Sequence, residues 1–130
     1  MKTLIADDDF TSSIVLEKIF KHYGLVVLVK DGKEAVDEVQ KAVEEKVSYN
    51  LICLDIMMPN MSGRSALVKI REIEDKAGIR GLDRSKIVMI TAQDDNRNII
   101  DSFNDECDGY IIKPFNKKSL IDKLVALDLI

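Results

Sequence analysis

Residues 3–9 read TLIADDD, a short apolar run that ends in three consecutive carboxylates. Apolar runs of this kind recur along the chain, at residues 3–6, 26–29, 51–54, 87–91 and 109–112. The segments between them place apolar side chains three and four positions apart, which is the spacing of a helix with one buried face. Near-continuous apolar strands that alternate with helices are typical of a parallel sheet covered on both faces. We therefore predict a doubly wound α/β fold of five strand–helix units.

The expected helices are recognised by their apolar stripes and by residues that cap their first turns. The stripes are Val15, Leu16, Ile19, Phe20 and Tyr23; Ala35, Val36, Val39 and Val43; Ala66, Leu67, Ile70 and Ile73; Ile99, Ile100 and Phe103; and Leu120, Ile121, Leu124 and Leu127. Asp31 with Glu34 predicts the start of the second helix, and Asn116 predicts the start of the last. Residues 76–85 form an unusually long connection, for which we expect a surface loop or a partner contact.

Length and composition fit one domain and exclude several classes of protein. The chain has 130 residues, 46% of them hydrophobic, with 19 basic and 23 acidic residues and a net charge of −4. Without a basic run, binding to nucleic acid or to an anionic membrane surface is not expected. Neither a signal peptide nor a membrane span is apparent, and Cys53 and Cys107 lack metal-ligand spacing, so we predict reduced thiols and a cytoplasmic location.

Polar side chains follow the predicted strands at the point where each strand ends. These side chains are Asp7, Asp8, Asp9, Asp55, Thr91 and Lys113. The carboxyl ends of parallel strands meet at one edge of a sheet, where ligands bind in folds of this class. Singly, each residue is as well explained by a helix cap or a solvated loop. Together, however, the carboxylates among them would repel one another strongly unless a cation were bound.

Magnesium fits this set of ligands better than zinc does. Carboxylate oxygens are hard ligands, and Mg²⁺ commonly binds one or two carboxylates together with phosphate. His22 is the single histidine, and we expect it on the surface near the end of the first helix. An aspartate can attack phosphorus and form an aspartyl phosphate. Mg²⁺, Lys113 and the Thr91 hydroxyl would supply the charge neutralisation that phosphoryl transfer needs.

In order and spacing, these residues resemble the receiver domain of two-component response regulators. The likeness rests on five motifs: LIADDD at 4–9, DGKEA at 31–35, LDIMMP at 54–59 with Gly63 beyond, MITA at 89–92 and GYIIKPF at 109–115. It covers essentially the whole chain, so it implies one receiver domain over residues 1–130. It also implies a flavodoxin-like strand order of 2-1-3-4-5 and a cis bond before Pro114.

The resemblance further implies a role for each residue at the edge of the sheet. Asp55 would accept the phosphoryl group, with Mg²⁺ held by Asp55 and Asp8 directly. Asp7 would act largely through metal-bound water, and Met57 would contribute its backbone carbonyl. Lys113 would pair with the phosphoryl group.

Two further residues would respond to the phosphoryl group. Thr91 and Tyr110 would form a switch pair, in which the hydroxyl turns toward phosphate and the ring follows inward. A fixed, half-buried aromatic is the alternative for Tyr110. Met57 and Gln93 occupy the positions that tune dephosphorylation in this family, and Asp9 departs little from its pattern.

By the same resemblance, the chain would be a phosphoacceptor and not an enzyme. Its partners would be a histidine kinase or phosphotransfer protein and a downstream protein. That target would bind the face of the fourth helix, fifth strand and fifth helix. We expect a stand-alone regulator, as a monomer or a phosphorylation-dependent dimer. An excised domain is the alternative.

Three other functions fit these residues less well. One is a Mg²⁺-dependent phosphatase or phosphotransferase with an Asp nucleophile, but haloacid-dehalogenase-type enzymes usually have a second Asp as acid/base where Met57 stands, so general acid/base help would be missing. A flavin-binding protein is disfavoured because Asp7, Asp8 and Asp9 would repel the flavin phosphate. A phosphate-independent interaction module is disfavoured by the complete set of residues.

Overall fold

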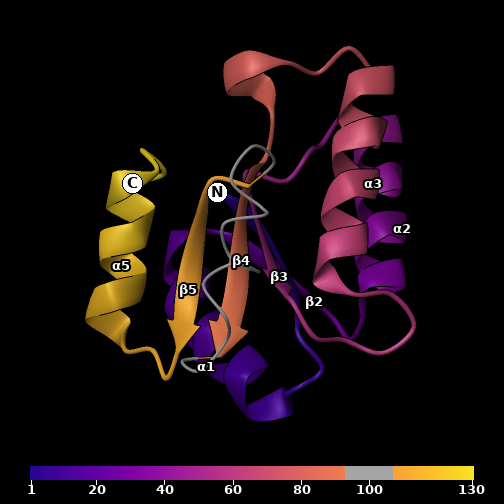
Figure 1. Cartoon of the computed structure of the whole chain (residues 1–130). Coiled ribbons are helices and arrows are strands. Elements are labelled where there is room, and N and C mark those ends of the chain that lie inside the picture. Colours follow the sequence, from indigo (N-terminus) through magenta and orange to yellow (C-terminus); the bar gives the residue numbers. More distant parts are fainter. Residues whose placement is uncertain (93–106) are drawn as a thin grey trace.

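Five parallel strands form one sheet in the order β2-β1-β3-β4-β5, as expected (Figure 1). The computed structural model describes residues 1–92 and 107–130. The strands are β1 (Lys2–Ala6), β2 (Leu25–Val29), β3 (Leu51–Asp55), β4 (Lys86–Ala92) and β5 (Gly109–Lys113). Because β1 lies between β2 and β3, the loops that follow these three strands are neighbours at one edge of the sheet.

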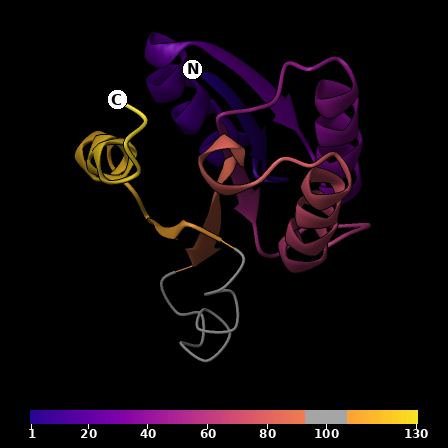
Figure 2. The same cartoon turned by 90° about the horizontal axis from the view of Figure 1, so that it is seen from above.

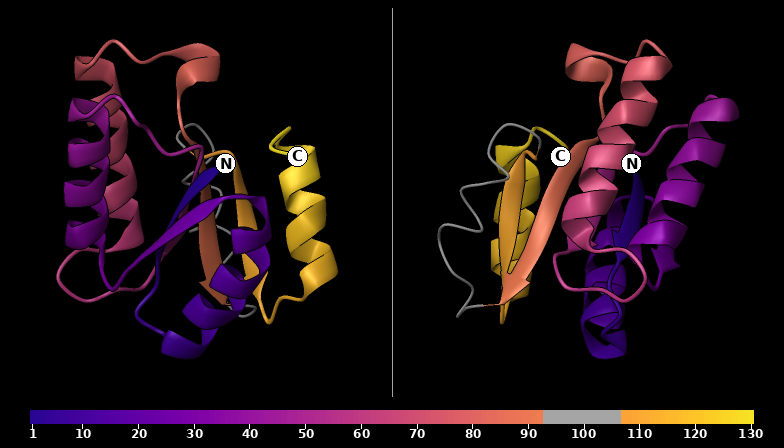
Figure 3. Two further views of the ribbon diagram at one scale, coloured as in Figure 1. Left: turned by 180° about the vertical axis from the view of Figure 1, so that it is seen from behind. Right: turned by 45° about the vertical axis from the view of Figure 1, so that its right-hand side comes forward.

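Helices cover both faces of the sheet, which confirms the doubly wound arrangement (Figures 2 and 3). The helices are α1 (Phe10–Phe20), α2 (Gly32–Glu44), α3 (Gly63–Lys76) and α5 (Lys117–Ala126), with short 3₁₀ turns η1 (Lys21–Tyr23) and η2 (Gly81–Asp83). Side chains of α2 and α3 share one hydrophobic core with the sheet, and those of α1 and α5 share the other. The predicted helix at Ile99, Ile100 and Phe103 lies outside the described residues, as does Gln93. Within the described residues, no helix is both long and apolar enough to cross a lipid bilayer.

The strands extend one or two residues beyond the apolar runs that predicted them. Parallel pairing continues into polar residues, since Asp55 pairs with Ile90 and Lys113 pairs with Ala92. The backbone ladder therefore fixes the positions of Asp55 and Lys113, whose side chains belong to the site. The buried face of α1 is also shifted from the prediction. Val15 is 38% exposed, whereas Ser13 is buried.

Side-chain caps define the helix starts, and the predicted caps are confirmed. Asp31 accepts a hydrogen bond from the Glu34 amide (2.9 Å), and Asn116 accepts one from the Ser119 amide (2.8 Å). Ser62 caps α3 in the same way, although the sequence analysis did not single it out. His22 is exposed in η1, close to where we expected it.

Residues 76–85 form a surface excursion at the end of the sheet opposite the strand carboxyl ends (Figure 1). The excursion contains η2, and the side chain of Leu82 is 94% exposed. Its last residue, Ser85, is buried and leads into β4. The predicted surface loop is therefore confirmed, whereas a partner contact there stays a prediction.

A buried ionic network joins α3 to the starts of β4 and β5. The guanidinium of Arg71 donates to Glu74 Oε1 (2.7 Å), to the Ser85 carbonyl (2.9 Å) and to Asp108 Oδ2 (3.0 Å). Glu74 Oε2 accepts from the Ser85 amide (2.7 Å), and Asp108 Oδ2 accepts from the Ile87 amide (2.8 Å). Arg71 is 6% and Glu74 is 2% exposed, so each charge depends on its partner.

Replacing Arg71 with alanine should therefore destabilise the protein far more than breaking a surface ion pair. The change removes the nearer cation of buried Glu74 and leaves it the longer contact with Arg84 Nε (3.8 Å), and loss of a buried partner typically costs about 3 kcal/mol in the free energy of unfolding. Urea unfolding followed by circular dichroism measures this loss. The matched control is Lys118→Ala, which breaks the exposed pair with Asp122 and should change stability little. Equal effects of the two substitutions would contradict this account.

Candidate functional site

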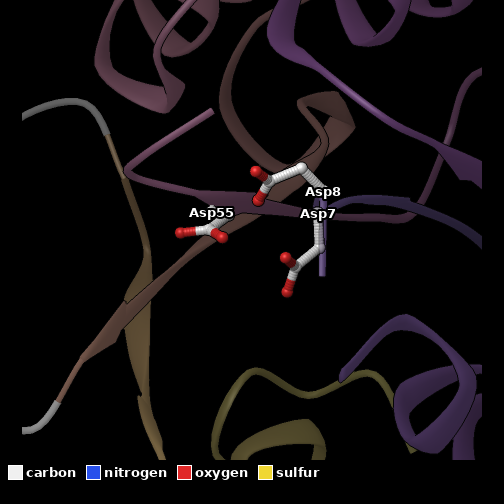
Figure 4. A group of neighbouring side chains, drawn as sticks. All are labelled: Asp7, Asp8 and Asp55. Carbon is white, nitrogen blue, oxygen red and sulfur yellow. The ribbon is translucent and has the colours of Figure 1, made fainter. Parts of the chain in front are cut away.

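Three carboxylates meet at the carboxyl edge of the sheet, and Figure 4 shows them turned toward one another. Asp7 and Asp8 follow β1, and Asp55 ends the neighbouring strand β3. One oxygen from each carboxylate lies within 4.8 Å of the other two. Asp7 is buried, Asp55 is half-buried and Asp8 is exposed, so the cluster opens toward solvent through Asp8. Hard oxygen ligands in this arrangement can hold Mg²⁺.

Lys113 supplies the positive charge on the other side of the cluster. Its ammonium lies 3.2 Å from Asp7 Oδ2 and 3.6 Å from Asp55 Oδ2. Among the residues that the structure describes, none donates a hydrogen bond to the buried Asp7 Oδ2, so the nearby ammonium acts on it as an ion-pair partner. Burial lowers the pKa of Lys113, but the charges of Asp55 and Asp7 outweigh burial and raise it overall. Lys113 therefore stays protonated.

Backbone amides orient two of the carboxylates. Asp7 Oδ1 accepts from the Asp9 amide (2.9 Å), and Asp55 Oδ1 accepts from the Met57 amide (3.2 Å). The second of these bonds places the backbone of Met57 beside the carboxylate of Asp55, while the Met57 side chain is 74% exposed. The loop after β3 can thus offer the backbone groups of Met57 to the site while the Met57 side chain stays in solvent.

Asp9 has a different structural role from Asp7 and Asp8. It is the N-cap of α1, where its carboxylate accepts from the Thr11 amide (3.1 Å) and from the Ser12 hydroxyl (2.9 Å). The Ser12 bond contributes most to lowering the pKa of Asp9. The capping explanation considered for the acidic run is therefore correct for its last member, whereas Asp7 and Asp8 join the cluster.

The pKa of Asp55 is strongly raised. Burial raises its pKa to about 7, and the neighbouring Asp7 adds to the increase. Lys113 and the Met57 amide act in the opposite direction, but they are outweighed. In the absence of a metal ion, Asp55 therefore gains its charge only near neutral pH. A divalent cation would favour the charged form.

The two predicted switch residues lie on neighbouring strands near this edge. Thr91 is buried at the end of β4, and its hydroxyl donates to the Ala92 carbonyl (3.3 Å). Tyr110 is half-buried on β5, directly opposite Met89 of β4, and packs against the core shared with α2 and α3. The peptide bond between Lys113 and Pro114 is cis, as the resemblance implied.

A largely apolar cavity adjoins the acidic cluster, and the sequence analysis did not predict it. It has a volume of about 380 Å³ and is lined by Asp7, Asp8, Phe10, Val29 and Pro59, among others. The side chain of Phe10 is 76% exposed. An exposed aromatic residue that directly follows the acidic run is the signal that could have indicated this feature.

Comparison with known proteins assigns the family. The model of the response regulator receiver domain matches residues 3–125, and the chain belongs to that family. Receiver domains act in two-component signalling, where they are phosphorylated on an aspartate by histidine kinases. The regulatory protein VanRB of Enterococcus faecalis is 32% identical over 124 residues, covering 95% of this chain and 50% of VanRB.

Other relatives and solved structures agree with this assignment. The hybrid signal transduction histidine kinase I of Dictyostelium discoideum is 30% identical over 125 residues, covering 93% of this chain and 7% of that protein. The chain thus spans half or less of these two curated relatives. The chemotaxis protein CheY4 of Vibrio cholerae shares the fold, with a TM-score of 0.77, 23% identity and 96% of each chain covered.

One similar structure contains ligands. The receiver domain of the histidine kinase CKI1 of Arabidopsis thaliana, complexed with Mg²⁺ and BeF₃⁻, has a TM-score of 0.78 and 25% identity. The match covers 97% of this chain and 89% of that domain.

The raised pKa of Asp55 gives a test of the cluster's electrostatics. Between about pH 4 and pH 7 the folded protein holds a proton that the unfolded chain has released, so metal-free stability should fall as pH rises through this window. Asp55→Asn removes the effect. In EDTA, we expect the stability of the variant to rise relative to wild type by roughly 1.3 kcal/mol between pH 5 and pH 8. This is about half of the roughly 2.7 kcal/mol that two pKa units between pH 5 and the folded pKa imply, because solvent screens a half-buried group.

Urea unfolding at several pH values measures this difference. The comparison is between two pH values for each protein, so effects of the substitution that do not depend on pH cancel. If the stability difference between Asp55→Asn and wild type stayed constant from pH 5 to pH 8, the proposed burial of an Asp55 charge would be wrong.

Proposed function

We propose that this chain is a phosphorylation-controlled signalling domain whose acceptor is Asp55. The observation that carries this proposal is the convergence of Asp55 with Asp7, Asp8 and Lys113 at one edge of the sheet. Residues 1–130 would form one receiver domain acting in the cytoplasm. The donor would be a histidine kinase or a phosphotransfer protein, as expected for this family.

Asp55 is better suited than its two neighbours to accept the phosphoryl group. Asp7 is buried, and one of its oxygens already faces the Lys113 ammonium while the other accepts from a backbone amide. Asp8 is exposed and accessible to a hydrated ion. Asp55 is half-buried, with one oxygen held by the Met57 amide and the other 3.6 Å from the Lys113 ammonium.

The acidic cluster fits Mg²⁺, because within the described part of the chain its three carboxylates are offset by the single ammonium ion of Lys113. Asp8 and Asp55 would hold the ion directly, Asp7 through water, and the Met57 carbonyl would complete the protein ligands. The bound ion would neutralise charge on the phosphoryl oxygens during transfer. The related CKI1 domain was crystallised with Mg²⁺ and BeF₃⁻, which supports this proposal.

In the transfer itself, an Asp55 oxygen forms a bond to phosphorus while the bond from phosphorus to the donor imidazole nitrogen breaks. The donor nitrogen leaves with the electron pair of that bond, so no redox partner is needed. Lys113 would offset the added negative charge. Within residues 1–92 and 107–130, the cluster offers no general base besides its own carboxylates, which favours a phosphoacceptor over a phosphatase that turns over external substrates.

The signal would leave the domain through Thr91 and Tyr110. Thr91 lies near the end of β4, the strand adjacent to β3. A phosphoryl group on Asp55 offers new acceptor oxygens to the Thr91 hydroxyl. Movement of Thr91 would alter the packing around Tyr110 on the next strand. The output would be contact with a downstream protein on a face that includes β5 and α5. The predicted contribution of a fourth helix to that face lies outside the described residues.

Phosphorylation should occur on Asp55 and depend on Mg²⁺. Incubation with acetyl phosphate and Mg²⁺ should add one phosphoryl group that is stable in acid and labile in base, as an acyl phosphate is. Intact-mass spectrometry measures the addition, which should be absent with EDTA or in Asp55→Asn. His22→Ala is the control and should be phosphorylated normally. A phosphoryl group on a serine, threonine or His22 would refute the assignment.

The different roles proposed for Asp8, as a metal ligand, and for Asp9, as a helix cap, can be tested with one pair of variants. Asp8→Asn removes a proposed ligand and should weaken Mg²⁺ binding by about tenfold or more. Asp9→Asn makes the same change in charge one residue later but preserves the helix cap, so its effect should be small. Titration with Mg²⁺ followed by NMR gives both affinities. Equal losses would mean that only total charge, and not ligand position, determines binding.

A further inference from the structure

A side-chain hydrogen bond joins the two loops that lie on either side of β1. Asn60, in the loop after β3, donates through Nδ2 to Asp31 Oδ2 over 2.7 Å. Asp31 ends the loop after β2, is 8% exposed, and uses its other carboxylate oxygen to cap α2. The same two loops are joined by the Gly32 amide, which donates to the Met61 carbonyl (3.2 Å). The bridge therefore passes across the end of β1, the strand that Asp7 and Asp8 follow.

The backbone on both sides of this bridge is closely constrained. Asn60 has a φ of 64°, in the left-handed region that asparagine tolerates better than most residues. A Cβ on Gly32 would overlap the Met61 carbonyl oxygen, and one on Gly63 would overlap the Asp55 carbonyl oxygen. The Gly63 amide also donates to the Ile56 carbonyl (3.0 Å), so the loop returns onto its own start. The loop is held at both ends, with Asn60 near its middle.

This loop carries the backbone groups that serve Asp55. Met57 lies three residues before Asn60, and its amide donates to Asp55 Oδ1. Pro59, the residue before Asn60, lines the cavity beside Asp7 and Asp8. The Glu34 amide, followed by the Asn60 side chain, lowers the pKa of Asp31, so Asp31 accepts as a full carboxylate. Hydrogen bonds to a charged acceptor are stronger than those between neutral groups.

We propose that Asn60 is a positioning residue: through its bond to Asp31, it holds the loop after β3 so that Met57 stays against Asp55 and its carbonyl is presented to the metal ion. The half of the proposal that concerns the metal rests on the proposed function. The half that concerns Met57 and Asp55 applies to the metal-free protein and can be tested separately. Asp31 is thus both the cap of α2 and the anchor for this loop.

Asn60→Gly is the direct test, because glycine adopts a φ of 64° without strain and the substitution removes the CH₂–CONH₂ side chain that bonds Asp31. The matched control is Lys46→Gly. Lys46 has a φ of 59°, is exposed, and lies just beyond the far end of α2. Both substitutions add the same flexibility to the unfolded chain and leave the local backbone conformation available. Any difference between them reports the bond to Asp31.

Two measurements distinguish positioning from a purely structural role. In metal-free protein, the Met57 amide should exchange with solvent roughly fivefold faster in Asn60→Gly than in wild type, the factor expected for one lost hydrogen bond. The dissociation constant for Mg²⁺, from NMR titration, should rise by a similar factor of about five. Lys46→Gly should change neither quantity, and Asn60→Gly should have the lower melting temperature of the two, because only that variant loses the bond to Asp31.

A double substitution provides the rescue. Asn60→Asp alone sets two carboxylates against each other and should break the bridge. Combined with Asp31→Asn, it reverses donor and acceptor. The amide side chain introduced at position 31 could cap α2 through its oxygen and donate through its nitrogen to the carboxylate introduced at position 60. The double variant has the net charge of wild type, so its Mg²⁺ affinity and its Met57 amide exchange should both return toward wild-type values.

Unchanged Met57 exchange in Asn60→Gly would overturn the proposal, as would equal effects of Asn60→Gly and Lys46→Gly. Failure of the double variant to recover would also count against it. If wild-type protein bound no Mg²⁺ while Met57 exchange still accelerated in Asn60→Gly, the proposed function would fail and the positioning role of Asn60 would stand.

Discussion

Like charges crowd the carboxyl edge of this sheet, and the rest of the structure maintains that crowding. Parallel pairing of β1 with β3 brings together the residues that follow them, so that one oxygen each of Asp7, Asp8 and Asp55 lies within 4.8 Å of the other two. Lys113 offsets part of the charge from β5. The cluster keeps an excess of negative charge, which favours a cation and a phosphoryl group that arrives with one.

At the opposite end of the sheet, buried charges are paired with charges of opposite sign. There Arg71 is matched by Glu74 and Asp108, and backbone amides and carbonyls satisfy much of the remaining hydrogen bonding. Such a network is complete without a ligand and fixes α3 against the sheet. Ionisable groups that are paired within the protein stabilise the fold. The cluster of Asp7, Asp8 and Asp55 carries unbalanced charge, which is typical of a functional site.

Much of this arrangement could be read from the sequence, because hydrophobic period and strand-end chemistry are local signals. The five strands, the caps at Asp31 and Asn116 and the meeting of Asp7, Asp8, Asp55 and Lys113 were all predicted. The exposure of Val15, the network around Arg71 and the bridge between Asp31 and Asn60 were not. Each depends on how segments distant in sequence pack together, and neither Arg71 nor Asn60 differs locally from an ordinary polar surface residue.

The central claim is that one metal ion and one phosphoryl group share the space between Asp8, Asp55 and Lys113. A crystal structure of this chain grown with Mg²⁺ and beryllofluoride, a phosphoryl mimic, tests it most directly. We expect beryllium bonded to an Asp55 oxygen, Lys113 against a fluorine, and Mg²⁺ in contact with Asp8, Asp55 and the Met57 carbonyl. Beryllofluoride bound elsewhere, or Mg²⁺ bound away from Asp8 and Asp55, would contradict the account.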